Sequence, residues 1–333
     1  MAQYNFQNLV FEGGGVKGIA YGGALDVLQE KGILSNIKRV AGTSAGAINA
    51  SLLALGYTSA EVSKIVAETD FSKFADSGGI ISDVARILRL FGWNKGDAFK
   101  KFIREQIEAK TGNPDFTFAQ LDAAVQEKRP GFRHLYTVCT NLSLQKAQTF
   151  SHEHTPDTSI ADAVRMSMSI PFYFQAIKWN GHVMVDGGVS YNYPINLFDN
   201  KKYLSNAANG KEETYDPTPG FVFNYETLGF RLDSKDVIEY NRKGWQLSPA
   251  EVGNIKEYSM SLMNFMMEMA NRAHLNDNDC NRTVSIDTLD VKTTDFAGVK
   301  TKIDALIKSG RNAVTEYFNW RDGDAVWSTR PNQ

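Results

Sequence analysis

Apolar and polar positions in the first ninety residues alternate between short strand-like runs and longer helix-like stretches. The apolar run Leu9–Phe11 ends in three glycines, and Ile19–Gln29 then places apolar residues at intervals of three and four. A second apolar run, Ile37–Ala41, ends in Gly42 and is followed by the helix-like Ala45–Leu55. A strand, a glycine-rich turn and a helix, twice in succession, predict a parallel sheet covered by helices.

The rest of the chain continues this mixture of patterns. Further helices are predicted at Ser59–Ala67, Ile80–Leu90, Gly96–Lys110, Phe118–Gln126, Ile160–Ser169, Pro249–His274 and Lys300–Trp320. Further strands are predicted at Phe132–Thr140, Ala147–Phe150, Phe221–Tyr225 and Arg282–Asp287, and two more within Tyr173–Asp186, turning at Asn180–Gly181. The polar stretch Asp199–Gly220 indicates a surface loop or insertion. We therefore expect an α/β fold of three layers, α/β/α, with a central, mostly parallel sheet.

Composition and charge narrow the class of protein. Of 333 residues, 42% are hydrophobic and 22% are charged, and the formal net charge is −2, which is typical of a globular protein and gives no general attraction to nucleic acid. Two cysteines, Cys139 and Cys280, are too few for a disulfide framework and favour a reducing compartment. Residues 1–8 lack a signal-peptide pattern, and no run of about 18 apolar residues occurs. We expect a cytoplasmic protein that meets membranes only peripherally.

The first candidate for chemistry is the segment Gly42-Thr43-Ser44-Ala45-Gly46, between a predicted strand and a predicted helix. The pattern G-x-S-x-G in that position is a nucleophile elbow, in which small neighbours permit a sharp turn that presents the serine hydroxyl. The alternative is a serine that only caps the helix that follows. We expect Ser44 to be the nucleophile.

The second candidate is the glycine-rich turn Gly13-Gly14-Gly15-Val16-Lys17-Gly18. Successive amides at a helix start bind anions, so this turn is predicted to be the oxyanion hole of an acyl hydrolase. It also matches the dinucleotide pattern G-x-G-x-x-G, which requires an acidic residue about 20 positions later, at the end of the second strand. The second strand here ends in Ala41-Gly42-Thr43, without an acid.

The base that a serine nucleophile needs is predicted to be Asp186, which ends the apolar run Val183–Val185 and precedes Gly187 and Gly188. An acid at the end of a strand, beside glycines that allow close approach, is a typical catalytic placement in α/β folds. None of the five histidines has a recognisable triad context: His134, His152, His154, His182 and His274. A carboxylate base is expected to titrate below the imidazole pKa of about 6.5.

Together these motifs resemble the patatin-like phospholipases. That family combines a glycine-rich oxyanion turn, a G-x-S-x-G elbow and a distant Asp-Gly-Gly in the same order, and Ser167-Met168-Ser169-Ile170-Pro171 is similar to its Ser-x-Ser-x-Pro segment. The resemblance covers roughly residues 8–198, which it identifies as the catalytic core, and we expect residues 199–333 to continue the same domain. Lys17 stands where many members carry arginine.

The resemblance implies a calcium-independent Ser–Asp dyad that hydrolyses lipid or phospholipid esters at a transient membrane surface, without cofactor or metal. Any activating factor and the oligomeric state stay open. The acidic run Asn276-Asp277-Asn278-Asp279 lacks the glycine and glutamate of a calcium loop. The alternatives are an acyl transferase of the malonyl-transfer type, which normally uses a histidine partner, and a non-catalytic nucleotide-binding module built on the glycine turn.

Five of the nine methionines fall between Met260 and Met269. Their spacing places several of them on one helical face, which ordinary core packing explains best. An acyl-chain wall, a membrane-facing helix and a partner surface are the alternatives, since methionine adapts to flexible apolar groups.

Overall fold

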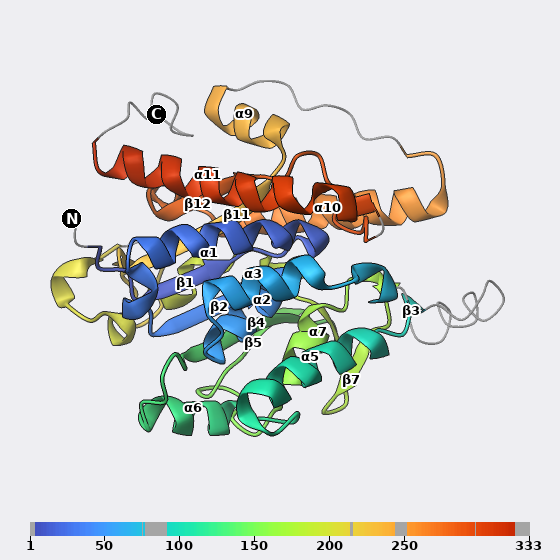
Figure 1. Ribbon diagram of the computed structural model, residues 1–333, viewed down its shortest axis with the longest axis horizontal. Coiled ribbons are helices and arrows are strands. Elements are labelled where there is room, and N and C mark those ends of the chain that lie inside the picture. The colour runs from blue at the N-terminus through green and yellow to red at the C-terminus, as the bar shows by residue number, and fades with distance from the viewer. Residues whose placement is uncertain are drawn as a thin grey trace.

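An eight-stranded sheet forms the centre of the computed structural model, which describes residues 4–74, 76, 92–213, 216–243, 252–296 and 298–323 (Figure 1). In spatial order its strands are β12 Thr283–Asp287, β11 Thr227–Asp233, β1 Asn8–Phe11, β2 Arg39–Thr43, β4 His134–Asn141, β8 His182–Asp186 and β7 Ile177–Trp179, and β5 Lys146–Phe150 also pairs with β4. The first five are mutually parallel, whereas β8, β7 and β5 run antiparallel to their neighbours. The predicted mostly parallel sheet is thus confirmed.

Alternation along the strands divides the core between the two faces of the sheet. Leu9 and Phe11 of β1 pack into the larger core cluster with the helices that follow the first strands. Val10, between them, packs on the other face with Ala41 of β2 and Tyr136 of β4. Because successive side chains of a strand point to opposite faces, a strand buried on both sides is mostly apolar, and Leu9–Phe11 of β1 follow that pattern.

Helices complete the outer layers. Those described are α1 Tyr21–Glu30, α2 Ala45–Ala54, α3 Ser59–Glu68, α5 Asp97–Thr111, α6 Phe118–Gln126, α7 Ile160–Ser167, α8 Gly188–Tyr191, α9 Lys235–Lys243, α10 Ile255–His274 and α11 Ile303–Arg321. Figure 1 shows α11, near the end of the chain, running beside α1 near its start, and the two are in contact. The short 3₁₀ helices include η1 Gly15–Ala20, η4 Ile195–Phe198 and η7 Asp277–Arg282.

Most predicted elements occur within a few residues of their expected bounds. The turn at Asn180–Gly181 joins β7 to β8 with φ values of 47° and 80°, as expected of a tight hairpin. Cys139 is buried in β4, as its apolar surroundings predict. The predicted helix Ile80–Leu90 lies outside the described residues, and the predicted strand Phe221–Tyr225 is reduced to β10 Phe223–Asn224, which pairs with β9 Gly210–Lys211 in a separate two-stranded sheet.

The largest difference from expectation is β11, which the sequence pattern did not reveal. This strand lies between β1 and β12 and is buried along its whole length, although Thr227, Arg231 and Asp233 are polar. Residues beyond position 199 therefore supply two strands to the same sheet as residues 8–11 and 39–43.

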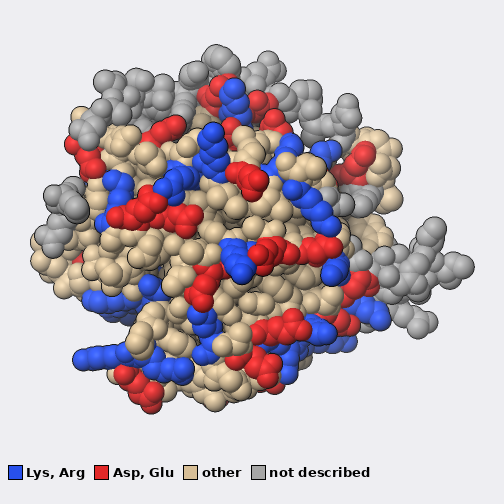
Figure 2. Space-filling view, viewed as in Figure 1, with Lys and Arg blue, Asp and Glu red and all other residues tan. Residues whose placement is uncertain are grey.

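The outer surface mixes both signs of charge. Figure 2 shows acidic and basic side chains interspersed over the visible face, in keeping with a formal net charge of −2. Among the described helices, none is both long enough and apolar enough to cross a membrane.

Candidate active site

Ser44 lies at a strained turn between β2 and α2. Its backbone has φ 53° and ψ −124°, a combination that side-chain-bearing residues rarely adopt and that clusters at functional sites. Gly42 and Gly46 make this turn possible, because a Cβ on Gly42 would lie 2.3 Å from the Gly46 backbone and one on Gly46 would lie 2.3 Å from the Phe11 carbonyl oxygen. The predicted elbow is thus present as a backbone structure, with Thr43 Oγ1 donating to the Tyr191 carbonyl at 3.0 Å.

The segment 167–171 holds the serine from the other side. Ser167 Oγ accepts a hydrogen bond from the Ser44 amide at 2.9 Å and donates to the Val138 carbonyl at 2.6 Å. The Ser44 hydroxyl donates to Met168 Sδ at 3.3 Å. Ser169 contributes its carbonyl, which accepts from the Asp186 amide at 2.9 Å. This segment therefore fixes the backbone of both Ser44 and Asp186.

Asp186 is fully buried at the end of β8. Its Oδ1 accepts from the Gly188 amide at 2.7 Å, and its Oδ2 has no hydrogen-bond partner among the described residues. Burial raises the pKa of Asp186 from 3.8 to about 7, although the Ser44 hydroxyl and the Gly188 amide act to lower it. The sequence-based expectation that this carboxylate titrates below imidazole does not hold for this geometry, because desolvation outweighs the opposing effects of the Ser44 hydroxyl and the Gly188 amide.

Glycines bring these elements together. A Cβ on Gly187 would lie 2.2 Å from the Val138 carbonyl oxygen, and one on Gly188 would lie 2.8 Å from Asn192 Oδ1. A Cβ on Gly13 would lie 3.0 Å from Ser44 Cβ, and one on Gly18 would lie 3.0 Å from Ala45 Cβ. The glycine-rich turn thus lies directly against the serine turn.

Within that turn, the backbone amides of the predicted oxyanion-hole residues differ in whether they already donate a hydrogen bond to the protein. The Gly13 amide donates to the Asn192 carbonyl, the Val16 amide to the Thr293 carbonyl at 3.1 Å and the Lys17 amide to the Gly14 carbonyl. Within the described part of the chain, the Gly14 and Gly15 amides donate to no protein acceptor. These two amides are therefore the ones available to a ligand.

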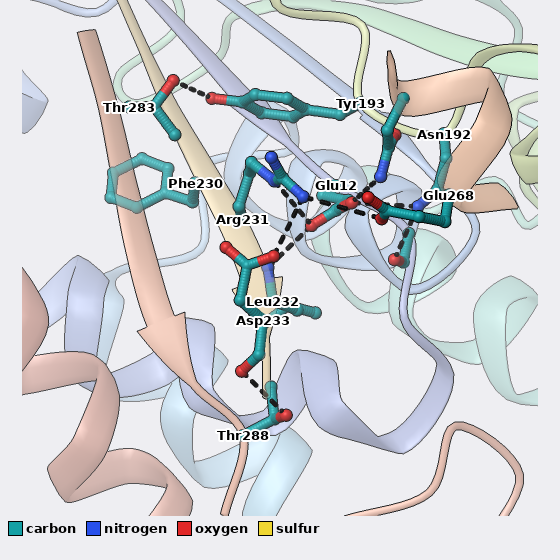
Figure 3. Close-up of polar contacts among 12 residues, drawn as sticks. Glu12, Asn192, Tyr193, Phe230, Arg231, Leu232, Asp233, Glu268, Thr283 and Thr288 are labelled. Atoms are coloured by element: carbon teal, nitrogen blue, oxygen red, sulfur yellow. Dashed lines mark hydrogen bonds and ion pairs between the residues drawn. The ribbon is translucent and has the colours of Figure 1, made fainter. Parts of the chain in front are cut away.

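Behind the turn lies a buried polar network that the sequence analysis did not single out (Figure 3). Glu12 Oε1 accepts from the side-chain amides of Asn192 at 3.1 Å and Asn271 at 2.6 Å, and Oε2 accepts from the Leu232 amide at 2.7 Å. Burial raises the pKa of Glu12 to about 7, while the Arg231 guanidinium opposes this shift. Glu12 thereby ties the strand end before Gly13 to β11, α10 and the segment after α8.

A cavity of about 230 Å³ opens beside this network. Gly13, Gly14 and Lys17 line one side of it, and Leu232, Asp233 and α10 line the other. Burial lowers the pKa of Lys17, an effect that Glu12 and Asp233 partly oppose.

The histidines lie elsewhere. Across the described residues, no histidine hydrogen-bonds to Ser44 or Asp186. His274 Nε2 lies 3.1 Å from the Ser190 carbonyl oxygen. His134 Nε2 lies 2.9 Å from Asp122 Oδ1 and its ring stacks on His152. The ligand atoms of these last three residues lie within 4.8 Å of one another, a potential cation site at the opposite end of β4 from Asp186.

Comparison with known proteins gives a family for this arrangement. The sequence profile described as patatin-like phospholipase matches residues 9–199, more than half of the chain. The chain belongs to the patatin-like phospholipase family. The match includes the glycine turn, the serine turn, the Ser-x-Ser-x-Pro segment and Asp186, whereas β11, α10 and β12 lie outside it.

Two viral proteins are similar in sequence to part of this chain. Protein R571 of Acanthamoeba polyphaga mimivirus is 34% identical over 200 residues, which are 60% of this chain and 63% of R571. Protein 463L of Invertebrate iridescent virus 6, named a probable lipid hydrolase, is 29% identical over 205 residues, which are 59% of this chain and 66% of 463L. The matches thus span slightly less than two thirds of either viral protein.

The patatin-like fold also has a solved counterpart. The crystal structure of VipD from Legionella pneumophila superposes on 95% of this chain and 67% of VipD with a TM-score of 0.59, at 19% sequence identity. At that identity the likeness concerns the fold.

Proposed function

We propose that this protein is a lipid acyl hydrolase of the phospholipase A type, in which Ser44 is the nucleophile and Asp186 its general base. The observation that carries this proposal is the fully buried Asp186 carboxylate, whose Oδ2 accepts no hydrogen bond from the described residues. Burial raises its pKa, and the Ser44 hydroxyl is close enough to oppose that shift. Membership of the patatin-like family and the name of the relative 463L support lipid esters as substrates.

The chemistry proceeds through an acyl-enzyme. Asp186 takes the Ser44 hydroxyl proton as Oγ attacks the ester carbonyl carbon, and the negative oxygen of the tetrahedral intermediate accepts hydrogen bonds from the Gly14 and Gly15 amides. The intermediate expels the lysolipid alcohol, which takes the proton from Asp186. Water then gives a proton to Asp186 and attacks the acyl group, so that fatty acid leaves and the Ser44 hydroxyl is restored.

The raised pKa of Asp186 suits this role. A base with a pKa of about 7 accepts and returns a proton near neutral pH more evenly than an ordinary aspartate with a pKa near 4. All proton transfers use Asp186, so we expect a chelator such as EDTA to leave turnover unchanged.

We further propose that residues 199–333 form one domain with the core at 8–198. The support is that β11 and β12 pair into the same sheet as β1, and that Arg231 and Leu232 of β11 contact Glu12 beside the glycine turn. No observation favours a nucleotide-binding module or a malonyl-type acyl transferase over hydrolysis.

The test combines labelling with product analysis. A fluorophosphonate probe should label wild-type protein at Ser44 and should not label Ser44→Ala, and incubation with mixed phospholipids should release free fatty acid, measured by mass spectrometry. Labelling elsewhere, or fatty acid release by folded Ser44→Ala protein, contradicts the proposal. Transfer of the acyl group to an added thiol or alcohol, without release to water, assigns the protein to the transferases instead.

A further inference from the structure

Exposed apolar side chains are concentrated on one helix. Seven of the eleven large hydrophobic residues that are exposed in the described chain lie between Val252 and Met269. Six of them belong to α10 and are named here the α10 stripe: Ile255, Tyr258, Leu262, Phe265, Met266 and Met269. Phe265, at 63% exposure, and Ile255, at 72%, are among the most exposed. Scattered apolar residues on a surface are ordinary, but such a concentration marks an interaction site.

The stripe is a coherent face of the helix. Its members follow one another at spacings of three, four, three, one and three residues, which places all six within an arc of about 100°. A separate face carries the polar residues Glu257, Asn264, Glu268 and Arg272.

The side of α10 that packs on the protein is a third face. It consists of Ser259, Met263, Met267 and Asn271, all buried and spaced by four. The methionine-rich segment of the sequence therefore divides: Met263 and Met267 belong to the core, whereas Met266 and Met269 belong to the stripe. Because the inward face is already packed, the stripe is left exposed within the described part of the chain.

The position of α10 connects the stripe to the candidate active site. α10 contacts α8, which begins two residues after Asp186, and a Cβ on Gly188 would lie 2.7 Å from Met267 Cε. The polar face contributes Asn264, Glu268 and Arg272 to the wall of the cavity that Gly13 and Gly14 also line. A lipid in contact with the stripe is thus one helix width from the glycine turn.

We propose that the α10 stripe is the surface by which this protein docks on a lipid bilayer, with α10 lying in the membrane interface. The inference rests on the proposed function, since an enzyme that hydrolyses insoluble esters must reach them at a surface, and the polar face of α10 beside the stripe lines the cavity. A helix with an apolar face that includes aromatic residues, beside a polar face, is typical of interfacial binding. The neighbouring polar face carries both signs, with Glu257 and Glu268 against Arg272. We therefore expect attachment through apolar area, with little dependence on anionic lipid or salt.

The experiment measures binding apart from catalysis. Ser44→Ala protein is sedimented with sucrose-loaded phosphatidylcholine vesicles. The same measurement is made on two double variants, in which Phe265→Gln or Tyr258→Gln is combined with Ser44→Ala. Tyr225→Gln is the matched control, because its exposure of 46% is similar to the 56% of Tyr258. Tyr225 precedes the amino end of β11, whereas Ser44 follows the carboxyl end of the parallel strand β2. Each stripe variant should lower the partition coefficient by about tenfold, and Tyr225→Gln should leave it unchanged. Replacing part of the phosphatidylcholine with phosphatidylglycerol, or adding 0.5 M salt, should change it by less than about threefold.

In the active background, stripe variants should lose hydrolysis of vesicles while keeping hydrolysis of a soluble short-chain ester. Vesicle binding that is equal in the stripe variants and the control overturns the proposal. The proposal is also overturned if the Ser44→Ala protein does not bind vesicles and instead forms a dimer in sedimentation velocity that only the stripe variants dissociate. If binding depends on the stripe but wild-type protein releases no fatty acid, docking stands and the proposed function fails.

Discussion

Ser167 supports Ser44 through the backbone: its hydroxyl accepts the Ser44 amide hydrogen at 2.9 Å. The same hydroxyl donates to the Val138 carbonyl at 2.6 Å, so one side chain joins the strained serine turn to the strand β4 that pairs with β8. Since Asp186 ends β8 and its amide donates to Ser169, the serine and the aspartate are held to one rigid segment. Their relative position is therefore set by hydrogen bonds that do not take part in the chemistry.

This relationship predicts a positioning role for Ser167. Ser167→Ala leaves the buried Ser44 amide without its acceptor, which should cost about 1–3 kcal/mol of folding free energy. It should also displace the nucleophile and lower kcat roughly 10- to 100-fold, with a smaller change in KM. Ser51→Ala is the control, because Ser51 is a buried serine of α2 that donates only to the Ile48 carbonyl. Equal losses of kcat in the two variants would show that Ser167 acts only through stability.

The strain at Ser44 makes a prediction that separates catalysis from folding. Both Ser44→Ala and Ser44→Gly should abolish ester hydrolysis, but glycine should relieve the strain of φ 53° and ψ −124°, worth about 1–3 kcal/mol, which alanine keeps. Thermal unfolding of the two inactive proteins measures the difference. A Ser44→Gly protein no more stable than Ser44→Ala would mean that the turn is not strained in solution.

The glycine turn should respond differently at neighbouring positions. Gly14 has φ −173°, outside the left-handed region that favours glycine, and the nearest contact of its added Cβ would be the end of the Leu232 side chain, so Gly14→Ala should fold. The added methyl group should push against Leu232 and displace the Gly14 amide from the oxyanion, which should lower kcat by roughly 100-fold or more. Gly15 has φ +58°, and its Cβ would lie 2.0 Å from the Thr293 carbonyl oxygen, so Gly15→Ala should unfold at a much lower temperature. Circular dichroism and steady-state kinetics distinguish these outcomes, and unchanged kcat in a folded Gly14→Ala protein would contradict the prediction that the added methyl group disturbs the oxyanion site.

The serine turn, the glycine turn and the strand end at Asp186 could be predicted from sequence because each depends on neighbours in the chain. Gly42, for example, is needed because its Cβ would meet the backbone of Gly46, four residues later. The strand β11 could not be predicted in the same way. Its Arg231 forms ion pairs with Asp233 on the same strand and with Glu12 and Glu268, which are distant in sequence. Nothing local indicates that such polar residues are buried.

Glu12 shows that the sequence pattern that identifies Asp186 also fits a second residue. An acid that ends an apolar strand and precedes glycines singles out Asp186, and Glu12 fits the same description. Only the structure separates them, because Glu12 accepts three hydrogen bonds from protein groups, whereas one oxygen of Asp186 accepts none among the described residues. The same holds for the methionines of α10, whose assignment to core or surface depends on which face of the helix meets α8.

Because Asp186 is buried, we expect that removing its charge raises the stability of the protein while it abolishes activity. Because its folded-state pKa is raised from 3.8 to about 7, the folded protein holds this proton more tightly than the unfolded chain does. The stability lost by ionisation therefore grows from about pH 4 to about pH 7 and is complete above that. Asp186→Asn removes the charge and should be more stable than wild type by on the order of 2–4 kcal/mol at pH 8, and by much less at pH 5, while lacking activity. Thermal melts at pH 5 and pH 8 test this prediction. Glu12 is present in both proteins, so its own titration cancels from the difference in stability between them. An equal difference at the two pH values contradicts a raised pKa.

The choice between a dyad and a histidine triad requires substitutions, because a pH profile cannot decide it. The acid limb of kcat/KM should report a pKa of about 7 for Asp186, and an ordinary histidine titrates near 6.5. His182 lies on the same strand as Asp186, but four residues of extended chain separate them by roughly 13 Å. His274 is closer, since it bonds to the Ser190 carbonyl and packs on Tyr191 of α8. We expect His182→Gln to keep turnover within about threefold of wild type, and His274→Gln to lose at most about tenfold through packing. Asp186→Asn should lose more than about a thousandfold. A folded His274→Gln protein as inactive as Ser44→Ala would show that the mechanism includes this imidazole, and Asp186 would then be its orienting partner and not the base.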